Sequence, residues 1–347
     1  MTDLVLRDQE PGDADALEAL GGQAPDGGSI AFSTQRHVPA AADQDDHSFG
    51  VVAQDRATGA LLGAARVRLG QCRVGGQLRP YALLGSLAVH AEHRRQGIGA
   101  ALARWRIERA TELQGPETVL VAEIQSGNVA SLANARTWAE QFVGRLVVAP
   151  VPMRRRPPRP RPDVTVRPVQ PGELAEVAER LDVFTADHDL ARLHTAETLT
   201  AWLAGSPLPD PVNHYLVATD RAGRLLAGMG LREAGRLSSL HVHRMPAAVR
   251  LANLALHVVP RDGVMRNLEV DKAWFAPGHA GAARQLWEAA RWELRRHSTS
   301  LVATYDVTSA LRPVLRTPPW MPTTSITMAV RSPVPIEPGR VLEAFGQ

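Results

Sequence analysis

The residues best suited to chemistry are an arginine and two glycines at the spacing Arg94-x-x-Gly97-x-Gly99. They stand between an apolar run at 83–89, typical of a buried strand, and a helical pattern that continues to Trp105. The first N–H groups of a helix have no partner within it, and the helix dipole favours an anion there. Glycine has no Cβ, so an anion can approach the backbone closely. The pattern predicts a seat for a phosphate group.

Two common phosphate loops do not fit this stretch. A P-loop ends in Gly-Lys-Ser/Thr, which is absent, and a dinucleotide-binding loop has its first glycine directly after the strand. Together with the apolar run and the residues at 91–94, the motif instead resembles the acyl-CoA pyrophosphate loop of the GCN5-related N-acetyltransferase (GNAT) family. The alternative is an ordinary strand-to-helix turn with surface arginines.

The GNAT resemblance implies where acyl-CoA would bind. In that family two neighbouring strands splay apart after a bulge, and the pantetheine arm of CoA pairs with the free edge of the first strand. Asn128 and Ser131 resemble the family's Asn-x-x-Ala/Ser segment on the other side of the arm, although Asn128 also suits a helix N-cap. The resemblance assigns the arm to Leu87, Ala88 and Val89, and the pyrophosphate to Arg94, Arg95, Gln96, Gly97, Ile98, Gly99 and Ala100.

Acyl transfer to an amine needs a base for the amine, a donor for the oxyanion and a proton for the leaving thiolate. A backbone N–H of the splayed strand would polarise the thioester carbonyl. Glu123 is the candidate base, with an exposed strand-end carboxylate as the alternative. Ser86 and His90 flank the same cleft as candidate proton relays, although His90 also suits an ordinary loop histidine. Seven residues after Asn128, where the family often has a catalytic tyrosine, stands Ala135, so the thiolate's proton is unassigned.

An internal repeat indicates two domains of one fold. The segment at 5–13 recurs at 165–173, with Arg7 and Asp13 matched by Arg167 and Glu173. Further along, 52–57 recurs at 217–222, 87–89 at 268–270 and 97–99 at 281–283, with an offset that grows as insertions in the second copy would produce. We predict a catalytic GNAT domain at 1–149, a Pro/Arg-rich linker at 150–163 and a GNAT-like domain with a degenerate CoA motif at 164–347.

Each half is predicted to be α/β, with a mostly antiparallel, twisted mixed sheet flanked by helices. The second half adds an inserted helix at 246–257. In the first half, strands are predicted at 4–7, 49–54, 61–69, 72–74, 77–79, 82–89, 119–124 and 145–148, helices at 13–20 and 99–113, and a helix or loop at 129–142.

The linker should be extended and outside the sheet, because proline removes a hydrogen-bond donor. Its arginines would keep it solvated; a patch for nucleic acid or an acidic protein is the alternative, which the absence of interleaved aromatics disfavours. His241 and His243 lie on one side of a strand, but no third ligand follows at a recognisable spacing, so no metal is expected.

We expect a cytoplasmic protein. Its one cysteine, Cys72, cannot form an intramolecular disulfide, the N-terminus lacks a signal-peptide pattern, and no apolar run approaches the roughly 20 residues that span a bilayer. We expect no membrane partner, and a monomer or homodimer. The net charge of +3 is small, which does not favour a nucleic-acid partner.

The resemblance therefore implies an acyltransferase that moves an acyl group from acetyl-CoA, or another acyl-CoA, to a primary amine of a small molecule by direct attack in a ternary complex. One alternative takes its acyl group from a carrier protein or aminoacyl-tRNA, with the arginine linker as docking surface. Another is a non-catalytic acyl-CoA-binding sensor. The second half would shape the substrate site, or hold a second CoA.

Overall fold

The computed structural model of the chain describes residues 4–21, 31–38, 48–245, 247–256, 259–315, 317 and 323–345. The first half contains strands β1 (Leu4–Asp8), β2 (Ala31–Arg36), β3 (Ser48–Asp55), β4 (Leu61–Val74), β5 (Gln77–Val89), β6 (Val119–Gln125) and β7 (Gln141–Pro152). Its helices are η1 (Pro11–Asp13), α1 (Ala14–Gly21), η3 (Ala91–His93), α2 (Ile98–Gln114) and α3 (Val129–Ala135).

The second half repeats this order with additions. Its strands are β8 (Thr165–Pro168), β9 (His188–Asp189), β10 (Ala191–Arg192), β11 (Asn213–Thr219), β12 (Leu225–Arg232), β13 (Ser238–Arg244), β14 (Val264–Met265), β15 (Asn267–Phe275), β16 (Ser300–Asp306), β17 (Thr324–Arg331) and β18 (Val341–Leu342). Its helices are η4 (Pro171–Glu173), α4 (Leu174–Phe184), α5 (Ala196–Ala204), α6 (Ala234–Leu237), α7 (Ala247–Leu256), α8 (Ala280–Glu293) and α9 (Arg312–Leu315).

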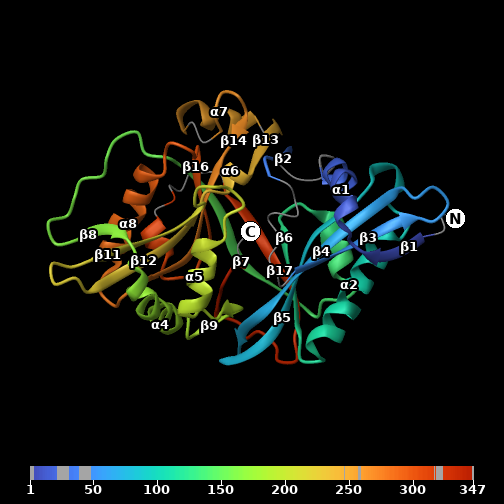
Figure 1. The fold of residues 1–347 in the computed structure, drawn as a ribbon, viewed down its shortest axis with the longest axis horizontal. Coiled ribbons are helices and arrows are strands. Elements are labelled where there is room, and N and C mark those ends of the chain that lie inside the picture. Colours follow the sequence, from blue (N-terminus) through green and yellow to red (C-terminus); the bar gives the residue numbers. More distant parts are fainter. Residues whose placement is uncertain are drawn as a thin grey trace.

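One sheet runs through both halves, in the order β1-β3-β4-β5-β6-β17-β7-β16-β15-β12-β11-β8. Figure 1 shows β7 and β17 in the middle of the molecule, with the two halves on either side. Strand β17, from the end of the chain, lies between β6 and β7 and is antiparallel to both. Strand β7 in turn pairs with β16. The tandem α/β fold is therefore confirmed, and its halves share strands.

Each half begins with the same strand-to-helix corner, in which an arginine of the first strand binds an acidic residue at the helix start. Arg7 donates to both carboxylate oxygens of Asp13 at 2.8 and 2.7 Å, and Arg167 does the same to Glu173 at 2.8 and 2.6 Å. In each copy the acidic residue also accepts the N–H of the residue three positions earlier, which closes a capping box at the helix start. The repeat read from the sequence is thus a repeat of contacts.

The stretch at 129–142, predicted as a helix or loop, is helical only to Ala135; the chain then turns at 136–138, buries Trp138 and enters β7 at Gln141. One local prediction is wrong. The linker was expected to stay outside the sheet, yet β7 continues through Pro150 and Pro152, which pair with β16. Pairing of β7 with β17 ends at Val148, so the prolines lie where β7 has one neighbour and needs fewer N–H donors. The domain boundaries themselves stay predictions.

The repeat of 87–89 at 268–270 is also wrong. On β5, Ser86 and Leu87 face one residue of β4, and Ser86 has φ 48°. On β15, Lys272 and Ala273 face one residue of β12, and Lys272 has φ 52°. The counterpart of 87–89 is therefore 273–275. The prediction failed because 268–270 and 273–275 both lie on β15. Both segments include apolar residues, so the sequence pattern alone does not distinguish them.

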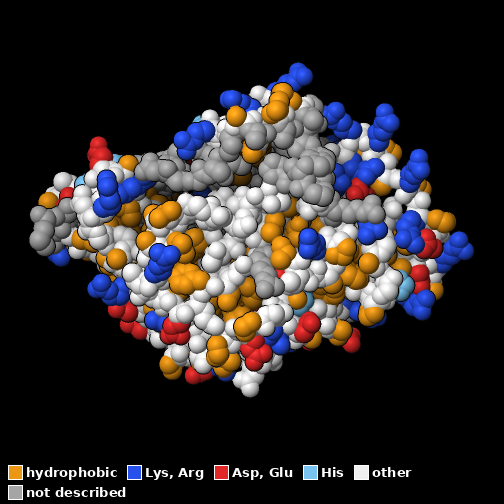
Figure 2. Space-filling view, turned by 180° about the vertical axis from the view of Figure 1, so that it is seen from behind, with side chains coloured by type: hydrophobic (Ala, Val, Ile, Leu, Met, Phe, Trp, Pro, Cys, Tyr) orange, Lys and Arg blue, Asp and Glu red, His pale blue; other side chains and the backbone are white. Residues whose placement is uncertain are grey.

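In the first half, α2 and α3 pack on the same side of the sheet. In the second half, α8 packs on the sheet. Helix α7, predicted at 246–257, is described from Ala247 to Leu256, and Pro246 and His257 lie outside the described residues. None of the described helices is both long and apolar enough to cross a membrane. On the face seen in Figure 2, apolar side chains gather toward the middle, basic side chains lie mostly along the upper and right rim, and acidic ones mostly along the lower rim.

Candidate functional site

Strands β5 and β6 part just before the bulge. They pair in parallel from Tyr81 opposite Val119 to Leu83 opposite Val121, and the register ends there. The bulge at Ser86 then turns the rest of β5 with β4 and away from β6. This leaves the β6-facing edge of 87–89 without a strand partner, which is the splay that the GNAT resemblance implies.

The loop between β5 and α2, residues 90–97, is called the glycine loop and lies at the far end of this opening. Arg95 and Gly97 have φ 62° and 85°, so the chain makes two left-handed steps before α2 begins at Ile98. A side chain at Gly97 would meet no atom within 4 Å, so its glycine is needed for conformation and open space rather than packing. Buried Ile98 anchors the helix start, and the first N–H groups of α2 have no carbonyl four residues back within it.

Side chains around the loop hold its shape. Arg94 Nε donates to Val89 O at 3.2 Å, and Asn134 Nδ2 donates to Gly99 O at 3.0 Å from α3. Asn128 Oδ1 accepts the Ser131 N–H at 3.0 Å, so the N-cap interpretation of Asn128 is correct. Whether the loop, Asn128 and Ser131 contact CoA stays a prediction.

Glu123 lies across the opening from the bulge, two residues beyond the last paired residue of β6. Its Oε1 accepts the N–H of Phe345 at 2.9 Å, and Arg68 donates to Phe345 O at 2.7 Å. The Phe345 ring packs on Tyr81 with centroids 4.6 Å apart. Burial raises the pKa of Glu123, and the Phe345 hydrogen bond and the charges of nearby arginines oppose that rise.

The second half brings charged side chains to the same place. Arg192 donates to both oxygens of Asp271 at 2.8 and 2.9 Å, and buried Lys272 pairs with the same carboxylate. Burial opposes ionisation of Asp271, but the two cations outweigh it and hold its pKa far below the usual range. Burial lowers the pKa of Lys272 to about 8. Strand β10, which carries Arg192, pairs with β4 of the first half, and the charges of Arg192 and Asp271 act on the pKa of Glu123.

The predicted relay residues are not brought together. Ser86 lies on the bulge, exposed, near the narrow end of the opening. His90 lies four residues further on, just after the end of β5, where it precedes η3. The relay role of both residues stays a prediction.

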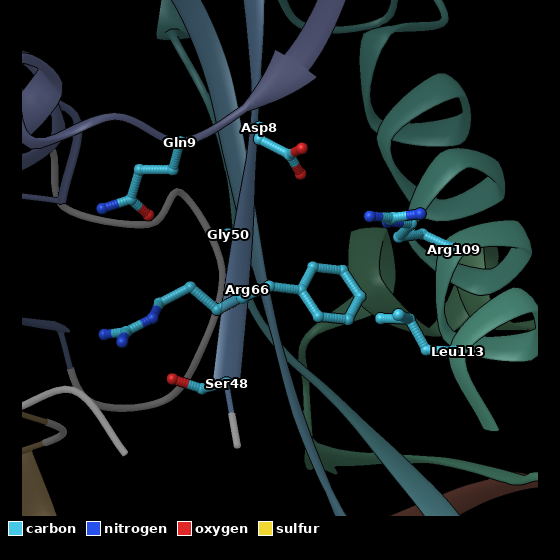
Figure 3. Close-up of a pocket in the computed structure, with 8 residues that line it drawn as sticks. Asp8, Gln9, Ser48, Gly50, Arg66, Arg109 and Leu113 are labelled. Carbon is cyan, nitrogen blue, oxygen red and sulfur yellow. The ribbon is translucent and has the colours of Figure 1, made fainter. Parts of the chain in front are cut away.

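Two hollows lie elsewhere among the described residues. One, of about 320 Å³, lies beside the C-terminal part of α2, where Asp8 and Arg109 line one side and Gln9 and Arg66 the other (Figure 3). The second, of about 350 Å³, lies where the linker crosses α8, and a Cβ at Gly281 would stand 2.4 Å from Arg161 Nη1. The linker's arginine thus covers the first turn of α8.

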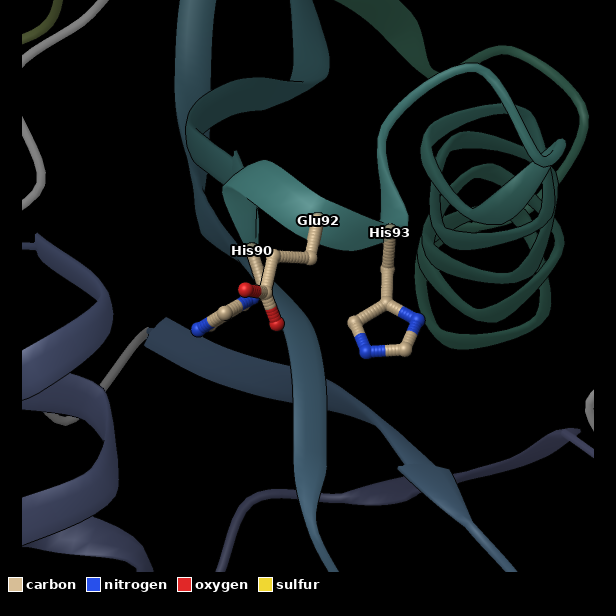
Figure 4. Close-up of side chains that lie close together, drawn as sticks. All are labelled: His90, Glu92 and His93. Carbon is tan, nitrogen blue, oxygen red and sulfur yellow. The ribbon is translucent and has the colours of Figure 1, made fainter.

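His90 also belongs to a small cluster with Glu92 and His93 on the loop before α2 (Figure 4). The nitrogen and oxygen atoms that could bind a metal lie within 4.8 Å of one another. Histidine and carboxylate are zinc ligand types, but Glu92 is exposed and Arg94 and Arg95 follow directly. The expectation that the chain holds no metal stays a prediction.

The second copy lacks the loop. Between β5 and α2 the chain has eight residues, whereas between β15 and α8 it has four. The bulge carbonyl of Lys272 is taken by Tyr215 Oη at 2.9 Å, and Trp274 is fully buried beside it.

Residues 19–136 match the acetyltransferase (GNAT) family. This segment runs from within α1 to the residue after α3, so it contains the bulge, the glycine loop and Asn128. The first half of the chain therefore contains a segment that matches the GNAT family. No curated protein sequence matches the chain.

Solved structures share the tandem GNAT fold. Saccharomyces cerevisiae N-myristoyltransferase with bound myristoyl-CoA has a TM-score of 0.64 at 10% identity, over 96% of this chain and 84% of that one. A GCN5-related N-acetyltransferase from Sphaerobacter thermophilus gives 0.56 at 16% identity, over 96% and 98%. One from Kribbella flavida gives 0.51 at 13%, over 94% and 71%. At these identities the likeness concerns the fold alone.

Sequence reasoning missed the partners of Glu123. Arg68, Arg192, Asp271 and Phe345 come from β4, β10, β15 and the end of the chain. No local spacing connects them. The one available signal was Lys272, the only lysine of the chain, next to an aspartate on an otherwise apolar strand.

Proposed function

We propose that the first half binds acetyl-CoA, or another acyl-CoA, in the opening between β5 and β6 and transfers the acyl group to a primary amine by direct attack in a ternary complex. The observation that carries this is the end of β5–β6 pairing at Leu83, followed by the bulge at Ser86. A splayed pair of strands leaves backbone N–H and C=O groups that must find other partners. The two amides of pantetheine are suitable partners.

The glycine loop would take the pyrophosphate. Its left-handed turns at Arg95 and Gly97 lead directly into the N-terminus of a 17-residue helix. Hydrogen bonds to charged oxygens contribute roughly 1.5–3 kcal/mol each. A few N–H groups among 95–100, with the charge of Arg94, would therefore fix the nucleotide end of the cofactor.

Glu123 would accept the amine's proton. Its raised pKa brings a carboxylate closer to the range in which a base works at neutral pH. It lies level with the bulge, where a thioester that follows β5 would end. Ser86, exposed at the bulge, would contact the acyl group or the amine.

The acceptor would be a small amine that enters between the two halves. The charges of Arg68 from the first half and of Arg192 and Asp271 from the second act on Glu123. The second half would therefore shape the acceptor site rather than hold a second CoA, because its loop before α8 is four residues shorter and Arg161 covers the helix start.

A donor carried by a protein or tRNA is the second candidate. The linker's arginines line the hollow at α8, and Arg159 is exposed. Replacing Arg155, Arg156 and Arg159 by glutamine should leave turnover of small amines unchanged. Loss of activity with a carrier or tRNA donor alone would favour this candidate instead.

Calorimetry with acetyl-CoA tests the binding site. Gly97→Glu adds a negative charge at the proposed pyrophosphate seat and should weaken binding at least tenfold. Gly97→Asn is the matched control, since asparagine tolerates the left-handed backbone without adding charge. Thiol release from acetyl-CoA with a panel of amines, and from myristoyl-CoA in parallel, then tests transfer and donor length. Unchanged affinity in Gly97→Glu would overturn the proposed site.

A further inference from the structure

Arg106 is a buried cation at the point where β5 and β6 part, and no acidic side chain among the described residues pairs with it. It lies on α2, is 3% exposed, and donates from Nη1 to Gly85 O at 3.0 Å. Its Nε is buried with no hydrogen-bond partner in the same part of the chain. Burial lowers the pKa of Arg106 to about 10, and no acidic group among the residues that the structure describes opposes that shift. A buried charge without compensation is costly, so it needs a reason.

The hydrogen bond to Gly85 shows where the guanidinium of Arg106 lies. Gly85 stands next to the bulge residue Ser86 and two residues beyond the last residue of β5 that pairs with β6. The guanidinium is therefore fixed at the narrow end of the opening, opposite the wider end where Gly97 lies.

At this point Glu123 and Arg106 lie on opposite faces of the sheet. On β6, Leu120 and Ala122 pack in the cluster that contains Ile107 of α2. Glu123 has the opposite orientation, since it accepts the N–H of Phe345, whose ring packs with Val121 in another cluster. A group held between the strands has a carboxylate on one side and an arginine on the other.

We propose that Arg106 stabilises the thiolate that leaves during acyl transfer. The inference rests on the proposed function. The amine attacks the thioester carbon from the Glu123 side, a C–N bond forms, and the amine's proton passes to Glu123. The tetrahedral oxyanion then collapses, the C–S bond breaks, and the electron pair leaves on sulfur on the Arg106 side. Water returns a proton to the thiolate as the product departs.

A fixed positive charge performs this task without giving up a proton. Ala135, the last residue of α3, stands where the GNAT resemblance would place a catalytic tyrosine; it is buried and cannot donate from its side chain. Preorganised charge in a site that excludes water acts strongly on a developing anion. Arg106 would thus lower the pKa of the CoA thiol when CoA is bound.

The thiol of bound CoA gives a direct measurement, because thiolate absorbs in the ultraviolet and the thiol does not. In the wild type, bound CoA should titrate at lower pH than free CoA. In Arg106→Gln the acid dissociation constant should fall at least tenfold toward the free value, and Arg106→Lys should lie between. With any amine that is turned over, Arg106→Gln should lower kcat about 100-fold with a nearly unchanged KM for acetyl-CoA.

Two further variants serve as controls. Arg104 is exposed on the same helix, so Arg104→Gln should match the wild type in both measurements. Arg106→Met fills the same volume without charge, and replaces Arg106→Gln if that variant does not fold. Identical thiol titrations in all variants that bind CoA would overturn the role of Arg106 and leave the proposed function intact. Failure of the wild type to bind CoA would overturn both.

Discussion

At the scale of the residue, Glu123 makes the pH dependence of the reaction predictable. Burial raises its pKa above the roughly 4.3 of a free glutamate, and a base works only when deprotonated. The rate should therefore rise with pH through this raised pKa. Glu123→Gln should lower kcat by about 10²–10⁴-fold and remove that rise.

The measurement is kcat/KM against pH for the amine that is turned over. Glu108→Gln, on an exposed position of α2, is the control and should keep the wild-type profile. A Glu123→Gln enzyme with the wild-type rate and profile would show that the proton leaves by another route.

Glu123 and Ser86 were accessible to sequence reasoning because each lies a few residues from a recognisable strand pattern. Arg106 was not, since it stands within the α2 pattern and nothing in the spacing shows that its side chain turns inward to Gly85. Phe345 was not either, since its hydrogen bond to Glu123 joins positions 222 residues apart. Local patterns locate the strand and loop, and tertiary contacts decide which side chains face them.

At the scale of the element, the paired corners at Arg7–Asp13 and Arg167–Glu173 predict a shared dependence of stability on pH. In each, the arginine's hydrogen bonds lower the pKa of the carboxyl below its usual value. A carboxyl with a depressed pKa in the folded state stabilises the fold above its unfolded pKa, near 4. That contribution is lost as pH falls through the folded pKa.

Asp13→Asn and Glu173→Gln should therefore each lower the free energy of unfolding by about 1 kcal/mol at pH 7. The difference from the wild type should vanish in acid. The two changes should add, because the corners share no partner. Denaturant unfolding at several pH values measures this, with exposed Glu18→Gln as the control. A constant difference at all pH values would contradict the assignment.

Helices and strands were predictable where one local sequence pattern was strong. The predictions failed where pairing with other strands of the sheet determines the structure. The apolar run of β5 and the helical period of α2 are local and strong. The stretch at 136–142 has helix-compatible residues, yet it turns after α3 and enters β7 at Gln141, where β17 offers hydrogen-bond partners. The prolines of β7 were misjudged for the same reason, since pairing on one side cannot be read from composition.

At the scale of the whole molecule, the duplication predicts one CoA for each chain. The first copy keeps an eight-residue loop before α2, and the second has four residues before α8, with Arg161 over the helix start. Calorimetric titration with acetyl-CoA should give a stoichiometry of about one. Arg161→Ala should leave it unchanged, whereas a second equivalent in the wild type would assign a binding role to the second half.

The order of strands also decides whether the halves can work apart. Strand β17 separates β6 from β7 and pairs with each over most of its length, so the sheet that carries Glu123 is completed by the last part of the chain. A fragment of residues 1–163 would leave facing edges of β6 and β7 unpaired and expose Val121 and Leu146, which are fully buried in the whole chain.

Expressed alone, this fragment should show no cooperative unfolding and no affinity for acetyl-CoA. Co-expression with residues 164–347 should restore both, because the second fragment carries β17 and β16. Circular dichroism on heating and calorimetry make the comparison, with the intact chain as reference. If 1–163 alone unfolds cooperatively and binds acetyl-CoA like the intact chain, the first half is an independent domain and β17 an accessory strand. If only the co-expressed pair binds, the duplicated domains have become one folding unit, and the acceptor site between them is a consequence of that shared sheet.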